Sequence, residues 1–229
     1  MVVTSGINGL LWFWNVQSGE KNFSLDNSEK IYTLTASPTK AMVAAGLNGK
    51  TKVWDINLQD EIAELQQAGD ISSLAFNHDG SLLATGSSEG TVILWKIDGN
   101  SFTQAGNTLH LNGYPRFLAF GPDGKWLAGG GSTNFAYLWD INTMQEMARI
   151  PHGNPVTSVS FSPDGSQLFT VSRKVVRIWD IALIPLILKE ELVPNACSHL
   201  ATNLSREDWI NYFADEEYRL ICPSLPEEE

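Results

Sequence analysis

Tryptophan recurs along this chain at an interval close to 40 residues, and this period constrains the fold more than any other feature. The series has gaps of 40, 41, 44 and 40 positions between its members: Trp14, Trp54, Trp95, Trp139 and Trp179. A turn signal (SPTK, NHDG, GPDG or SPDG) ends 14 or 15 residues before each of the last four, at Lys40, Gly80, Gly124 and Gly165. A fixed period of this length indicates one supersecondary unit that is stacked several times.

Each period contains short segments that predict strands. In the unit that begins at residue 71, ISSLAF, SLLATG and TVILWKI alternate in polarity and are rich in β-branched or aromatic residues, and the more polar SFTQAGN follows. Pro-Asp-Gly between two such runs predicts a tight hairpin. A four-stranded sheet that repeats every ~40–45 residues predicts an all-β fold of the β-propeller class.

The motifs VWDI, LWDI and IWDI, with SPDG at fixed distances, resemble those of the WD-repeat (WD40) propeller family over about residues 1–182. The resemblance implies a propeller segment over 1–185 and a separate C-terminal tail. VVTSG and LLWFWNV align with the second and third strands of a blade, and no fourth strand is readable after VVRIWDI. We therefore expect an open fragment of a ring of about seven blades, the first and last incomplete; a closed ring of five blades is the alternative. The expected blades and tail cover about 1–30, 31–70, 71–113, 114–154, 155–185 and 186–229.

In the family that this chain resembles, the repeated tryptophan packs between blades, and we expect this structural role for all five indoles. There it joins a hydrogen-bonded set with a His at the blade entrance, a Ser or Thr on the second strand and an Asp in the following turn. This chain departs from that pattern, because only His152 stands at such an entrance and the hairpins lack the Asp. We expect reduced polar anchoring and a fold that depends on apolar packing.

Motifs that carry chemistry are weak, so we expect no enzyme, no cofactor and no metal site. GSSEG at Gly86–Gly90 matches the G-x-S-x-G pattern of a nucleophile elbow, but it joins two predicted strands instead of a strand and a helix. Cys197, His199 and Cys222 offer three zinc ligands without a zinc-site spacing.

Charge and apolar runs narrow the function classes further. The net charge is −11 and Lys and Arg form no cluster along the sequence, which disfavours nucleic acid and anionic membrane surfaces as partners. The longest apolar run, IALIPLIL, is far shorter than the ~20 residues of a membrane span. Two cysteines make no disulfide framework, so we expect free thiols at Cys197 and Cys222 in a cytoplasmic protein.

With catalysis, nucleic-acid binding and membrane binding disfavoured, we expect the chain to bind a protein partner. Propellers of the resembled family bind partners on the rim formed by the loops that enter the first strands and by the middle hairpins. The larger side chains that project onto this rim include the aromatic and Arg types enriched at interface hot spots, although ordinary solvated loop residues are the alternative. These candidate partner-binding residues are Tyr32, Arg116, Phe135 and Arg173.

The tail carries helix signals in place of the repeat. Ser205 suits an N-cap with Asp208 at the third helical position, and Leu204 and Trp209 can form a hydrophobic staple. ACSHLATNLSREDWINYF and EEYRLICPSLP resemble the helical ending that follows the propeller in large bacterial multidomain signalling proteins. There, a signal-transduction ATPase, a caspase-like domain or another effector domain lies upstream. The resemblance implies a scaffold or sensor that binds a protein partner and that effector domain. The alternative is the regulatory C-terminal region of an NTPase, caspase-like protease or kinase whose catalytic domain is not in this chain.

Overall fold

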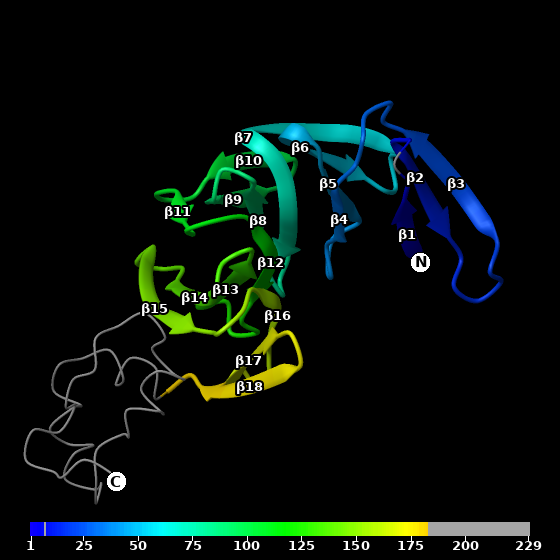
Figure 1. Ribbon diagram of the computed structural model, residues 1–229. Coiled ribbons are helices and arrows are strands. Elements are labelled where there is room, and N and C mark those ends of the chain that lie inside the picture. Colours follow the sequence, from blue (N-terminus) through cyan, green and yellow to red (C-terminus); the bar gives the residue numbers. More distant parts are fainter. Residues whose placement is uncertain (7, 183–229) are drawn as a thin grey trace, which may run out of the picture.

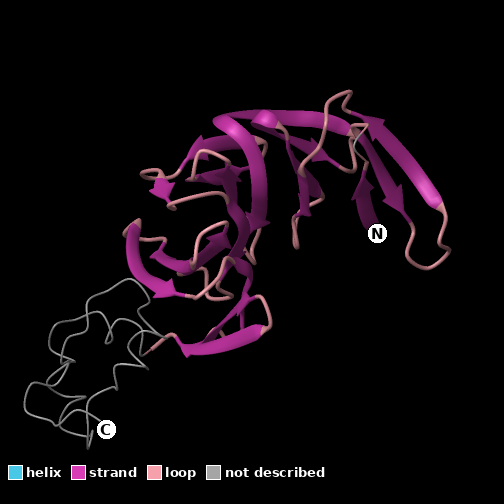
Figure 2. Ribbon diagram, viewed as in Figure 1, coloured by secondary structure: helices cyan, strands magenta, loops and turns pink. Residues whose placement is uncertain are grey.

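The computed structural model describes residues 1–6 and 8–182, and in this part the chain consists of strands, turns and loops without a helix (Figure 2). The expected all-β class is confirmed. The helix expected at Ser205 and the residues Cys197, His199 and Cys222 lie outside the described residues.

The strands form four sheets in which all neighbours are antiparallel. The first sheet has the order β1-β2-β3, with strands β1 (Val2–Ser5), β2 (Leu10–Trp14) and β3 (Lys21–Asp26). The second has the order β10-β9-β8-β7-β6-β5-β4, with β11 paired to β9. Its strands are β4 (Thr33–Ala36), β5 (Met42–Gly46), β6 (Asn48–Asp55), β7 (Asp60–Phe76), β8 (Leu82–Ser87), β9 (Thr91–Asp98), β10 (Ser101–Gln104) and β11 (Leu109–His110).

The last two sheets each follow chain order, β12-β13-β14-β15 and β16-β17-β18. Their strands are β12 (Pro115–Phe120), β13 (Trp126–Gly131), β14 (Phe135–Asp140), β15 (Gln145–Pro151), β16 (Val156–Phe161), β17 (Gln167–Ser172) and β18 (Val175–Asp180). Figure 1 shows the sheets along an open arc with the sheets β1-β2-β3 and β16-β17-β18 at its two ends, and β4, the end of β7, β12 and β16 on its concave side.

One strand joins two repeats, which the sequence did not lead us to expect. The boundary predicted at residues 70 and 71 falls inside β7, whose first half pairs with β6 and whose second half, from Ile71, pairs with β8. The strand stays hydrogen-bonded through the crossing because Asp70 is still opposite Asn48 on β6, and the Ile71 amide then donates to the Leu47 carbonyl at 2.9 Å. Gly69 bends the strand here with a φ of +83°, a conformation that favours glycine.

The repeated tryptophans occupy matching places on the strands. Trp54, Trp95, Trp139 and Trp179 each lie on the third strand of their repeat, opposite the second residue of the preceding strand. Those opposite residues are Val43, Leu83, Leu127 and Leu168. Trp14 lies opposite Val2, the first residue of β1.

The core lies between successive sheets. One apolar cluster joins Leu11 and Phe13 of the first sheet to Val43 and Trp54, and another joins Leu94 to the following sheet. The repeats also approach each other closely at a glycine near the ends of β5, β8 and β13. A Cβ on Gly46 would lie 2.7 Å from the Ile71 side chain, and one on Gly130 would lie 2.6 Å from Val156. Each sheet therefore buries its apolar face against the next sheet, as in a stacked-repeat fold.

Candidate binding rim

The hairpins between second and third strands and the segments that enter the first strands lie at the same end of the sheets. The Ser132 amide donates to the Tyr114 carbonyl at 3.1 Å, and the Val156 amide donates to the Thr133 carbonyl at 3.2 Å. A hairpin is therefore bonded both to the entrance of its own sheet and to that of the next. We call this end the rim; it comprises hairpins 47–50, 87–91, 132–135 and 172–175 and entrances 30–33, 69–72, 112–116 and 152–156.

The structure brings together three of the four predicted rim residues. Arg116 at the start of β12 and Arg173 in the β17–β18 hairpin are exposed, and Arg173 has a φ of +50°. Phe135 is half-buried, and it packs against the apolar cluster around Trp139 more than it projects from the rim. Tyr32 is 40% exposed beneath the Lys30 ammonium, but the repeat over 71–113 separates it from the other three.

Two exposed aromatic residues beside Arg116 were not expected. Tyr114 is 50% exposed and Phe117 is 36% exposed. The β12–β13 register shifts between Pro115 and Phe117, so Arg116 is the extra residue of a β-bulge. The signal in the sequence is Pro115, because proline at the first residue of a strand has no amide to donate to the ladder.

Equivalent bulges occur in three successive repeats, at Ser72, Arg116 and Thr157. Two of these side chains turn back onto the backbone: Ser72 Oγ donates to the Pro115 carbonyl at 2.6 Å, and Thr157 Oγ1 donates to the Val171 carbonyl at 3.3 Å. In the described part of the chain the Arg116 guanidinium makes no such bond and is exposed. The equivalent bulges at Ser72 and Thr157 therefore bind their side chains to the backbone, whereas the bulge at Arg116 presents its side chain to solvent.

Beneath the rim, one buried position differs in chemistry from repeat to repeat. It lies four residues before Ile31, Ile71, Pro115 or Val156, and its exposed fraction is 5–8% in each case. The residues at this entrance position are Asn27, Gln67, Leu111 and His152.

In the third repeat the entrance glutamine builds a buried polar network. Thr85 Oγ1 donates to Gln67 Oε1 at 2.5 Å and accepts the Trp95 indole N–H at 3.0 Å. Gln67 Nε2 donates in turn to Thr91 Oγ1 at 3.1 Å. The expectation of reduced polar anchoring is wrong for this repeat, because Gln67 takes the place that a histidine has in the resembled pattern.

In the fourth repeat the same place is apolar. Leu111 stands at the entrance and Gly129 replaces the threonine of the second strand, where a Cβ would lie 2.8 Å from the Trp139 ring. Tyr137 stacks on Trp139 with ring centroids 5.6 Å apart, and its hydroxyl accepts the Asn112 amide at 3.2 Å. Aromatic stacking here takes the place of the polar network.

In the fifth repeat His152 is buried without a hydrogen bond. The Trp179 indole donates to Thr170 Oγ1 at 2.8 Å, as Trp95 does to Thr85, but neither ring nitrogen of His152 has a partner in the described residues. The His152 ring packs edge-on against Trp179 at 6.3 Å. Burial, with a smaller contribution from the positive charge of Arg177, lowers the pKa of His152 from 6.5 to about 4.

Acidification is therefore expected to destabilise the fold through His152. Its pKa is lower in the folded than in the unfolded chain, so its contribution is fully present above pH 6.5 and is lost as the pH falls toward 4. The loss amounts to about 3 kcal/mol at most, from 1.36 kcal/mol per pKa unit. Urea midpoints at pH 7 and pH 4.5 measure it. The matched control is His152→Gln, which gives this entrance the same residue type as Gln67. An equal fall in both proteins would show that other groups carry the pH dependence.

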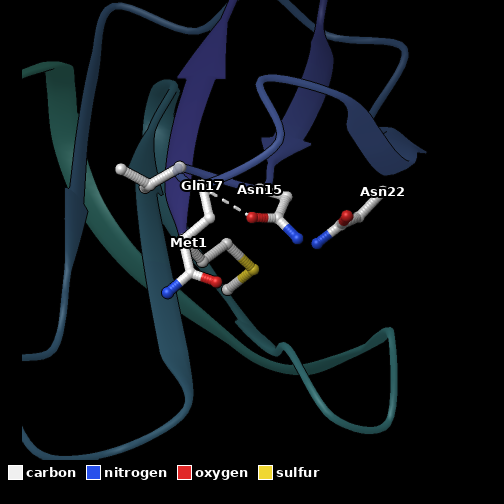
Figure 3. Close-up of a pocket in the computed structure, with 5 residues that line it drawn as sticks. Met1, Asn15, Gln17 and Asn22 are labelled. Atoms are coloured by element: carbon white, nitrogen blue, oxygen red, sulfur yellow. Dashed lines mark hydrogen bonds between the residues drawn. The ribbon is translucent and has the colours of Figure 1, made fainter.

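The other candidate sites in the described part of the chain lack an arrangement of side chains suited to catalysis or metal binding. Gly86–Gly90 joins β8 to β9 as a hairpin, so it is not the strand-to-helix turn of a nucleophile elbow. In the described part, no three acidic, His or Cys side chains gather as a metal site would require, and no helix is long and apolar enough to span a membrane. A surface pocket beside β1 is lined by Met1, Asn15, Val16, Gln17 and Asn22, none of which is an acid, a base or a nucleophile (Figure 3).

Comparison with known proteins agrees with this architecture. The family model WD40, described as WD domain, G-beta repeat, matches residues 60–96, 107–140 and 145–180. The chain is 27% identical over 110 residues to small ribosomal subunit protein RACK1z of Oryza sativa subsp. japonica, covering 44% of this chain and 33% of that protein. It is 30% identical over 101 residues to target of rapamycin complex subunit wat1 of Schizosaccharomyces pombe, covering 42% and 32%. The chain thus spans about a third of the length of these curated relatives.

A solved structure shares the fold. A chain in the crystal structure of a mitotic checkpoint complex superposes with a TM-score of 0.67 at 22% identity, covering 76% of this chain and 55% of that chain. Three segments of the chain are therefore similar to the WD40 repeat, and the antiparallel sheets resemble the blades of a β-propeller.

Proposed function

We propose that this chain is a protein-binding scaffold or sensor module with no catalysis of its own, and that it binds its partner at the rim. The observation that carries the proposal is the exposed group Tyr114, Arg116 and Phe117, held at the start of β12 by a β-bulge. Aromatic and Arg side chains on a rigid frame are the residue types that dominate binding energy at protein interfaces. The relatives named above, a ribosomal-subunit protein and a subunit of the target of rapamycin complex, support the same function.

We further propose that the described sheets are blades of a larger ring, with boundaries near 30, 70, 113 and 154. Two features support this: β1-β2-β3 and β16-β17-β18 have three strands each among the described residues, and the sheets follow an open arc (Figure 1). A bacterial signalling protein of the cytoplasm, with an effector domain elsewhere in the parent, is the setting that the tail sequence favours. If that effector is an ATPase, protease or kinase, the rim would serve as the regulatory sensor of an enzyme.

Capture of partners by the full chain tests the proposed function. Tyr114→Ala and Arg116→Ala are each expected to reduce at least one specifically captured protein about tenfold, the effect of losing one interface hot spot. Leu58→Ala is the matched control, because Leu58 is 66% exposed in the β6–β7 turn at the other end of the sheets. Quantitative mass spectrometry of proteins retained from cell extract measures the loss. Equal retention by all three variants would contradict binding at the rim.

A further inference from the structure

Charge is segregated between the two ends of the last two described sheets. All acidic residues of the span 111–182 lie away from the rim, in turns between first and second strands or at or opposite the ends of third strands: Asp123, Asp140, Glu146, Asp164 and Asp180. The rim of these two sheets and the residues that flank it, 112–117, 131–136, 151–158 and 171–177, contain no Asp or Glu. This is unusual in a chain whose net charge is −11.

The same rim segments carry four cationic side chains: Arg116, Arg173, Lys174 and Arg177. The first three are exposed, and the half-buried Arg177 donates to the Pro151 carbonyl at 2.8 Å, which fixes its guanidinium at the entrance of β16. Among the described residues none of the four forms a salt bridge. Lys50 and Lys52, by contrast, both pair with Glu29. These four cations are therefore not paired with a carboxylate of the described residues.

Backbone bonds connect the cations into one surface. The backbone of Arg116 lies against Gly131, whose hairpin is bonded through Thr133 to Val156. Val156 pairs with Ser172, the residue before Arg173. β12 and β16 accordingly lie side by side in Figure 1. We name Arg116, Arg173, Lys174 and Arg177, with Tyr114 and Phe117, the basic rim.

We propose that the basic rim recognises an acidic peptide segment of a protein partner, an inference that rests on the proposed function and adds the chemistry of the ligand. Guanidinium groups bind carboxylates with two parallel hydrogen bonds, and Lys174 adds a point charge beside them. Tyr114 and Phe117 supply apolar surface for the aliphatic or aromatic residues of such a segment. The acidic remainder of the chain repels the same segment, so the field directs it to this rim and away from the opposite end.

Selection from a phage-displayed library of random 12-residue peptides on the full chain tests the inference. Enriched peptides are expected to carry a net negative charge and to contain an aromatic or aliphatic residue. In fluorescence anisotropy with an enriched peptide, the double variant Arg116→Gln, Arg173→Gln is expected to bind about tenfold more weakly. A rise in NaCl from 50 to 200 mM is expected to weaken binding of the unaltered chain. The double variant Lys96→Gln, Lys125→Gln removes the same charge outside the basic rim and is expected to bind normally.

The possible outcomes distinguish a failure of acidic-peptide recognition from a failure of the proposed binding at the rim. Enriched peptides that are neutral or basic, or no enrichment, would contradict acidic recognition. If the enriched peptides are neutral but lose affinity when Tyr114 is replaced, binding at the rim is supported and acidic recognition is not. If their affinity is unchanged by replacement of either Tyr114 or Arg116, both the inference and the proposed binding at the rim are contradicted. A fluorescein-labelled 20-nucleotide single-stranded DNA that binds as tightly, with the same loss in the arginine variant, would show a general polyanion site and overturn the inference.

Discussion

Trp139→Ala is expected to destabilise the chain by about 3–5 kcal/mol, the range found when a large aromatic side chain is removed from a core. Trp139 is 1% exposed, stacks on Tyr137 and packs where the third and fourth repeats meet. Its loss leaves a cavity that Gly129, directly beneath the ring, has no side chain to fill. Urea unfolding followed by far-ultraviolet circular dichroism measures the change.

Trp14→Ala is the control for position in the repeat. Trp14 is half-buried in the first sheet, where it stacks on Trp12 and donates to Thr4 Oγ1 at 2.9 Å. Its removal is expected to cost less than half as much, because less apolar surface returns to water. An equal loss in the free energy of unfolding for Trp139→Ala and Trp14→Ala would contradict the claim that packing between sheets determines the stability.

Gly131→Ala is expected to cost at least about 3 kcal/mol or to prevent folding, because a new Cβ would overlap the Tyr114 carbonyl oxygen. It would also lie 2.9 Å from the Arg116 amide nitrogen, and neither backbone atom can move without breaking the bulge that presents Arg116. Thermal unfolding measures the effect. At about 2–4 °C per kcal/mol, Tm is expected to fall by roughly 6 °C or more.

Gly153→Ala is the matched control, since no atom lies within 4 Å of the Cβ position and its φ is outside the left-handed region. It is expected to change stability by no more than about 0.5 kcal/mol. A Gly131→Ala protein with an unchanged Tm would show that the bulge relaxes freely, and the rigid presentation of Arg116 would lose its basis.

The period of the fold was predictable because it depends on residues that recur in kind and spacing. An indole at the end of a third strand fills the gap between successive repeats, so tryptophan marks this strand at positions 54, 95, 139 and 179. The turn signals before these strands contain residues that favour a reversal of the chain. The continuous β7 was not predictable, because Gly69 and Asp70 favour a turn locally. Pairing with Asn48 and bonding to Leu47 keep the strand extended there.

The rim was predictable only in part. Arg116 and Arg173 are exposed, as their places at a strand entrance and in a hairpin suggest. Phe135 also lies at a hairpin, but it packs against the apolar cluster around Trp139. Phe117 was missed because strict alternation in RFLAF ignores the bulge at Arg116, and Tyr114 was missed because it precedes that run. The role of Gln67 was missed because its partners Thr85 and Thr91 lie on different strands, and a sequence pattern does not show which buried polar atoms meet.

Amide hydrogen exchange on the full chain, alone and bound to a captured partner, tests most directly the claim that the sheets are a frame and the rim is the binding surface. Slower exchange on binding is expected at 112–117, 132–135 and 172–175, with little change in the turns at 121–125 and 162–166. Protection confined to those turns, or to the pocket beside β1, would contradict it.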